Sequence, residues 1–171
     1  IEPLLPFDRL AAVNGLASCL AEQFKWDKAL GLAKQSRDAE PFQNLPYLIE
    51  YRIHQLQSEW QKAYDALNRY HEGTELFTRA NFDLNLSEEE TVLTMADLAL
   101  KIGNRKKASD HLNDFFELKD GDVEPSFLKK LLLLCIELKE KGKAEFFFKK
   151  YFDGAFPGKM EPQQQTELQD F

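Results

Sequence analysis

Two stretches of the chain repeat each other 34 residues apart. Trp26 and Ala29 recur with the same spacing as Trp60 and Ala63. A third copy, centred on Ala108, follows Ala63 after 45 residues, which is one period plus 11 residues. A period of this length is typical of chains that use one supersecondary unit several times, because a single unit cannot bury its apolar face without a neighbour. The spacing therefore predicts a repeat array.

The hydrophobic pattern predicts an all-α protein. Apolar residues recur at three- and four-residue steps through most of the 171 residues, and strand-like alternation is scarce. Leu16 and Leu56 are expected on the buried stripes of the first and third helices. Helices are expected over 8–20, 26–36, 44–56, 60–71, 87–103, 105–118, 125–138 and 143–152. Residues 160–171 either form a final helix or are loose.

Residues that favour helix ends lie at the borders of these segments. Ser87 and Glu90 have the spacing of a capping box, in which the hydroxyl and the carboxylate satisfy each other's backbone donors. Asp8 and Asn44 are expected to cap helix N-termini. Three glycines are expected to end helices, namely Gly73, Gly103 and Gly142.

The pattern resembles the tetratricopeptide repeat, a 34-residue helix pair with small residues where helices touch. The residues that match the family's small, large or terminal-proline positions are Ala17, Leu20, Ala29, Ala33, Pro41, Ala96, Ala99, Gly103, Ala108, Cys135 and Gly142. The resemblance covers about residues 8–152. Glu50 and Tyr51 depart from the family pattern in the second repeat, and the fourth repeat can be registered on Ala144 or on Gly142.

The resemblance implies a right-handed α-solenoid of about four antiparallel helix pairs in a single domain, 1–171. The repeats are expected at 8–41, 44–73, 87–120 and 125–153, with an irregular insertion at 74–86 and a C-terminal cap or tail at 154–171. The first helix of each pair would line a concave face, and the second would cover the convex face. The alternative is an ordinary all-α bundle in which the 34-residue recurrence is a coincidence.

Composition and motifs limit the chemistry that the chain can perform. A net charge of −7 and a pI near 5.1 disfavour a broad nucleic-acid interface, and a mean hydropathy of −0.48 disfavours a transmembrane helix. His54, His71 and His111 lack partners at metal-binding spacing. Cys19 and Cys135, both expected to be buried in helices, form no CxxC pair. We therefore expect no metal, no cofactor and no enzymatic activity.

Two surfaces are candidates for partner binding. The family register places seven residues on the concave side, namely Asn14, Ser18, Leu48, Arg52, Gln55, Asp97 and Lys101. The second candidate is an aromatic cluster near the C-terminal end, represented by Phe146, Phe147, Tyr151 and Phe156. This cluster either docks a partner or is covered by residues 160–171.

A helical repeat array without a catalytic motif indicates a non-catalytic module that binds a protein or a peptide, as a scaffold or adaptor does. The chain is expected to be a segment of a larger protein. The alternative is a regulatory or sensor arm of a multidomain signalling or transcription-regulating protein. In both cases, the partner is expected to be a protein or peptide, not nucleic acid, and no membrane insertion is expected.

Overall fold

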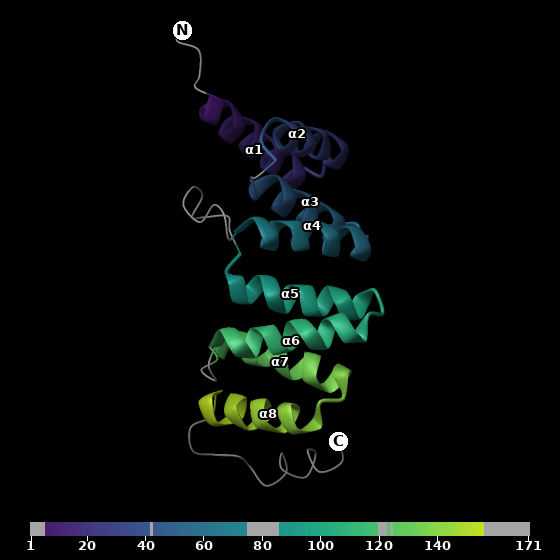
Figure 1. Ribbon diagram of the computed structural model, residues 1–171, viewed down its shortest axis with the longest axis vertical. Coiled ribbons are helices and arrows are strands. Elements are labelled where there is room, and N and C mark those ends of the chain that lie inside the picture. Colours follow the sequence, from purple (N-terminus) through teal and green to yellow (C-terminus); the bar gives the residue numbers. More distant parts are fainter. Residues whose placement is uncertain (1–5, 42, 75–85, 120–122, 124, 156–171) are drawn as a thin grey trace.

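The computed structural model describes residues 6–41, 43–74, 86–119, 123 and 125–155, which contain eight α-helices and no β-strand. The helices are α1 (Pro6–Glu22), α2 (Trp26–Ala39), α3 (Leu45–Leu56), α4 (Trp60–Thr74), α5 (Glu88–Lys101), α6 (Arg105–Lys119), α7 (Pro125–Leu138) and α8 (Lys141–Ala155). They lie in chain order along the long axis of the molecule, with α1 and α8 toward opposite ends (Figure 1). The all-α prediction is confirmed for this part of the chain.

The helices pack as four consecutive pairs: α1 with α2, α3 with α4, α5 with α6, and α7 with α8. Neighbouring pairs join where α2 packs on α3, α4 on α5, and α6 on α7. The backbones of α1 and α3 also approach each other, as do those of α5 and α7, whereas those of α2 and α4, or of α6 and α8, do not. Within the described residues, the backbones of the odd-numbered helices are therefore closer to each other than those of the even-numbered helices at two junctions. These are the junction of the first and second pairs and that of the third and fourth pairs.

Four turns of the same geometry join the helices within each pair. Each turn contains one residue in the left-handed region, with a φ of 59° at Phe24, 58° at Ser58, 77° at Gly103 and 63° at Lys139. The N–H of this residue donates to the carbonyl three residues earlier, and the next N–H donates to the carbonyl five residues before it, at 2.8–3.1 Å. This is the Schellman arrangement, which satisfies carbonyls at a helix C-terminus. The four turns are 34, 45 and 36 residues apart.

An alanine follows each of these turn residues after five positions. These alanines are Ala29, Ala63, Ala108 and Ala144, and the first three have no exposed area. The turn at Lys139 therefore registers the fourth pair on Ala144. The expectation that Gly142 ends the seventh helix is wrong, because α7 ends at Leu138 and Gly142 lies in the first turn of α8.

The buried side chains form two clusters that meet at α5 and α6. One cluster extends from α1 to α6 and the other from α5 to α8. Leu100 and Leu138 pack against both clusters, so the apolar interior is continuous along the stack. The largest completely buried side chains are Tyr70 in the first cluster and Phe115 in the second.

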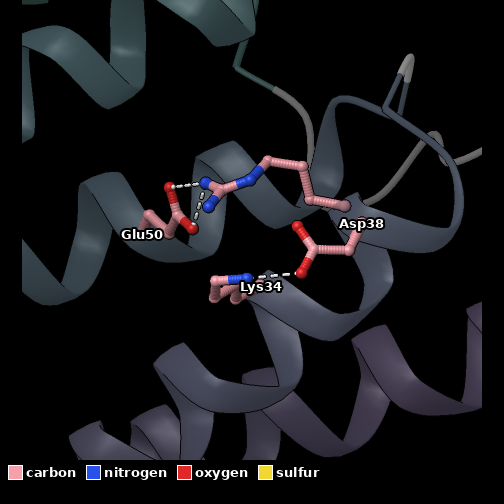
Figure 2. Close-up of polar contacts among 4 residues, drawn as sticks. Lys34, Asp38 and Glu50 are labelled. Carbon is pink, nitrogen blue, oxygen red and sulfur yellow. Dashed lines mark hydrogen bonds and ion pairs between the residues drawn. The ribbon is translucent and has the colours of Figure 1, made fainter.

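A partly buried ion pair joins the first two helix pairs. Arg37 in α2 donates through Nη1 to both carboxylate oxygens of Glu50 in α3, at 2.5 and 2.7 Å (Figure 2). The Arg37 side chain is 23% exposed and that of Glu50 is 14% exposed. Burial raises the pKa of Glu50, and the positive charge of Arg37 opposes that rise. The Lys34–Asp38 pair in the same view lies within α2 and is exposed.

The helix-end predictions are confirmed at two positions. The Glu90 N–H donates to Ser87 Oγ, and the Ser87 N–H donates to Glu90 Oε2, both at 3.1 Å, as a capping box requires. Gly103 adopts the left-handed conformation that ends α5.

Three other helix-end predictions need correction. Asp8 is not a cap, because α1 already begins at Pro6. Asn44 does precede α3, but its side chain makes no capping hydrogen bond. Gly73 does not end its helix, because α4 continues to Thr74.

Two predicted core leucines and one cysteine are on the surface instead. Leu16 is 53% exposed and Leu56 is 61% exposed. Cys19 is exposed, whereas Cys135 is buried as expected, and burial raises the pKa of its thiol to about 11. Both thiols are free.

Candidate partner-binding groove

A groove of about 540 Å³ lies between the N-terminal halves of α5 and α7, the first helices of the third and fourth pairs. Its lining combines apolar, hydroxyl and charged side chains: Leu86, Ser87, Glu89, Glu90, Leu93, Thr94, Ser126, Phe127 and Lys130. The apolar wall is anchored to the core, because Phe127 contacts the buried Phe115 ring edge-to-face with centroids 5.9 Å apart. A pre-formed depression of mixed polarity is a common form of binding site.

Lys130 is the only basic residue among the described residues that line this groove. Its ammonium donates a hydrogen bond to Thr94 Oγ1 at 2.9 Å. Burial lowers the pKa of Lys130, while the negative charges of Asp97 and Glu90 act in the opposite direction. An ammonium has three donors, so Thr94 leaves Lys130 with capacity to bind an additional acceptor.

The acidic residue Glu90, which lines the groove, also stabilises the N-terminus of α5. Glu90 accepts the Ser87 N–H in the capping box at the start of α5. Thr91, one turn after Ser87, donates its hydroxyl to the Ser87 carbonyl at 2.8 Å. These bonds hold the groove wall in place.

Exposed aliphatic side chains continue along α7 beyond Lys130. Leu133 is 52% exposed and Ile136 is 47% exposed, and the two lie three residues apart on the same helix. Lys130, Leu133 and Ile136 thus follow one another at three-residue steps. We call these three residues the α7 strip. It offers a polar anchor next to apolar contact area.

The structure distributes the seven predicted concave residues differently from the prediction. Leu48 has no exposed area and belongs to the core, and Asn14 is 3% exposed and donates to Gln43 Oε1 at 2.7 Å. Neither is available to a partner, so both predictions are wrong. The family register predicts accessible side chains at these positions, but Leu48 belongs to the core cluster that extends from α1 to α6, and Asn14 is held by Gln43 in the segment before α3.

The other five predicted residues are at least partly accessible, namely Ser18, Arg52, Gln55, Asp97 and Lys101. Lys101 donates to the Asp97 carboxylate at 2.8 Å. The Lys101 ammonium also lies 4.6 Å from the centroid of the Trp60 ring. The Lys101 ammonium therefore already has two intramolecular partners, Asp97 and Trp60.

The predicted aromatic patch divides into buried and exposed parts. Phe147 is 4% exposed and stacks on Phe116 of α6, with ring centroids 5.3 Å apart and planes 6° apart. It is therefore a core residue, and its assignment to a docking patch is wrong. Phe146 is 57% exposed. Tyr151 lies in α8 without a described side chain, and Phe156 and the proposed cover at 160–171 lie outside the described residues.

The histidines make structural contacts. His54 Nδ1 lies 2.7 Å from Glu59 Oε2. His111 Nε2 lies 2.8 Å from the Tyr64 hydroxyl, and its Nδ1 is 3.5 Å from Asp114. Burial raises the pKa of Tyr64 and lowers that of His111, which favours the neutral form of both. The described residues contain no group of three His, Cys, Asp or Glu side chains that could hold a metal ion.

Sequence reasoning missed the main groove residues, Thr94 and Lys130. Each lies nine residues before the left-handed turn residue of its pair, Gly103 and Lys139. They are therefore equivalent positions of successive repeats, and they meet because α5 lies beside α7. The correct register of the fourth pair was the signal that would have identified them.

None of the described helices combines the length and the apolar composition that crossing a membrane requires. No protein-family model matches the chain, and no curated protein matches it.

Proposed function

We propose that this chain is a non-catalytic protein-interaction module, built as a right-handed, tetratricopeptide-like α-solenoid. The observation that carries the proposal is the groove between α5 and α7 with its α7 strip. The partner is a protein segment that places apolar side chains on Leu133 and Ile136 and a hydrogen-bond acceptor on Lys130.

Two observations support the solenoid. Four pairs in chain order have the same turn and the same following alanine. The backbone of α1 approaches that of α3 and the backbone of α5 approaches that of α7, whereas the backbones of the described even-numbered helices do not approach one another. Closer odd-numbered helices are expected when the first helices of the pairs line the inner side of a curved array.

The surface chemistry supports binding. Leu133 and Ile136 are about half exposed and lie next to each other on α7. Other leucines of α7 already fill the core, so these two aliphatic side chains are not needed there. Neighbouring exposed aliphatic side chains mark interaction sites more often than single ones do. Lys130 beside them supplies a charged donor, and a partly desolvated charge gains more from an acceptor than an exposed one.

Site-specific photocrosslinking tests the proposal. A photoreactive p-benzoylphenylalanine replaces Leu133 in one protein and Leu118 of α6, which is 44% exposed, in a matched control. Extract from the native source is irradiated with each, with and without excess unmodified chain. The proposal predicts a discrete crosslinked protein from position 133 that the unmodified chain competes away and that position 118 does not give. Equal crosslinking from both positions, or none from position 133, overturns it.

A further inference from the structure

The edge formed by the last two intra-pair turns is strongly basic. Residues 104–107 and 137–143 contain six cationic side chains, Arg105, Lys106, Lys107, Lys139, Lys141 and Lys143, against two acidic ones, Glu137 and Glu140. The chain as a whole has a net charge of −7. The positive charge of this edge is therefore a local feature that opposes the overall composition. We call these residues the basic edge.

Two contacts fix the positions of the segments that form the basic edge. The Arg105 guanidinium donates to the backbone carbonyl of Glu137, which places the start of α6 beside the end of α7. Lys143 Nζ in α8 donates to Asn113 Oδ1 in α6 at 3.0 Å. The first contact sets the turn before α6 beside the turn after α7, and the second sets the start of α8 against the middle of α6.

Helix electrostatics does not account for these cations. The N-terminus of a helix carries a partial positive charge, which favours acidic residues in the first turn. Neither α6 nor α8 has an acidic residue in its first turn, and both have lysines there, whereas α5 begins with Glu88, Glu89 and Glu90. The lysines at the start of α6 and α8 are therefore placed against the preference of the helix itself.

The basic edge includes charges that the fold does not use. Lys107 lies 4.8 Å from the centroid of the Tyr64 ring, and Lys143 lies 3.4 Å from Glu140. By contrast, Lys106 and Lys139 are exposed and make no ion pair with any described residue. The Lys141 side chain is 82% exposed, and its nearest carboxylate, that of Glu145, is 3.8 Å away.

We propose that the basic edge docks a short acidic segment of a partner protein, through Lys106, Lys139 and Lys141. Charge complementarity carries the assignment, since three accessible ammonium groups are spread over two adjacent turns. A protein segment fits better than nucleic acid does, because nucleic-acid interfaces neutralise many phosphates at once and are typical of domains with a high pI. Because the chain has a net charge of −7, the surface outside the basic edge repels a long polyanion.

This surface is separate from the groove. The groove lies at the N-terminal ends of α5 and α7, and the basic edge follows their C-terminal ends. An α-helix rises about 1.5 Å per residue, so these 14-residue helices separate the two surfaces by roughly 20 Å. A variant of one surface can therefore be made without touching the other.

Binding of a fluorescein-labelled octaglutamate peptide, measured by anisotropy at about 0.15 M salt, tests the proposal, because that ionic strength screens distant charges. The test variant is Lys106→Glu/Lys139→Glu/Lys141→Glu. The control is Lys28→Glu/Lys129→Glu/Lys149→Glu, which changes the net charge equally at three other exposed lysines. Circular dichroism verifies that both variants keep their helix content.

The proposal predicts that the test variant weakens octaglutamate binding at least tenfold and that the control weakens it less than threefold. Leu133→Glu in the α7 strip is expected to leave octaglutamate binding unchanged, which separates this proposal from the proposed function. No binding to the unmodified chain, or equal weakening by both triple variants, overturns the proposal. Tighter binding of an octathymidylate oligonucleotide, lost in the same test variant, also overturns it in favour of nucleic acid.

Discussion

Lys130 Nζ donates to Thr94 Oγ1 at 2.9 Å, and the two residues hold the same position in successive helix pairs. The contact therefore depends on two levels of structure. Each residue is placed by its own turn, nine positions later, and the pair is brought together by the packing of α5 beside α7. A polar contact between equivalent repeat positions creates a site at the interface that neither pair has alone.

Replacing Lys130 tests whether this residue serves binding or stability. Lys130→Met keeps most of the side chain's length and removes a charge that burial already disfavours, so we expect the free energy of unfolding to change by less than about 1 kcal/mol. The same variant is expected to abolish the crosslink from position 133, and Lys130→Arg to retain part of it. Urea denaturation measures the first effect. A loss of about 3 kcal/mol or more would assign Lys130 to the fold instead.

The left-handed turns predict opposite effects for two exchanges. Ser58 has a φ of 58°, a conformation that glycine adopts without the steric cost of a Cβ, so Ser58→Gly is expected to stabilise the protein by about 1 kcal/mol. Gly103 has a φ of 77°, and Gly103→Ala is expected to destabilise it by about the same amount. Thermal denaturation of both variants measures the difference. Shifts of the same sign would contradict the shared turn geometry.

The Arg37–Glu50 pair predicts strong coupling between two substitutions. Arg37→Met leaves a partly buried carboxylate without its main partner, and we expect a loss of about 1–3 kcal/mol. Arg37→Met with Glu50→Met removes both charges and is expected to be more stable than Arg37→Met alone. A double-mutant cycle in urea measures the coupling. Additive effects would show that the ion pair does not link α2 to α3 energetically.

The pH dependence of stability is predicted to include a contribution from His111. Burial holds its pKa below 6.5 in the folded chain, so the unfolded chain takes up the proton first as the pH falls. The stabilising contribution is therefore present above pH 6.5 and decreases as the pH falls from 6.5 toward the folded-state pKa. His111→Gln is expected to reduce this dependence, measured as the difference in unfolding free energy between the two proteins. An unchanged difference from pH 7 to pH 5 would contradict it.

The sequence predicts the helices better than the turns. Apolar periodicity and recurring alanines locate the elements, because small residues are required where helices touch. The turns were harder to identify, since three of the four left-handed residues are Phe24, Ser58 and Lys139, which carry a Cβ. The sequence therefore predicts the fourth turn at Gly142, because a glycine is present there, but α8 has already begun at that residue.

Gly73 shows why residue type alone misplaces a helix end. Gly73 lies inside α4, and a Cβ at this position would collide with the side-chain oxygen of Asn44. The glycine therefore leaves space for Asn44 and does not mark the end of the helix. The groove depends likewise on how separate helices approach. The pattern along one helix does not reveal that Thr94 and Lys130 meet or that Leu48 is buried.

The most direct test of partner binding in the groove is hydrogen–deuterium exchange of the chain alone and in complex with the partner purified from the native source. The account predicts slower exchange in the complex at amides of residues 88–97 and 126–136, which form the walls of the groove and carry the α7 strip, with unchanged exchange in α2 and α4. Slower exchange confined to α2, α4 and α6, with none in α7, would contradict it.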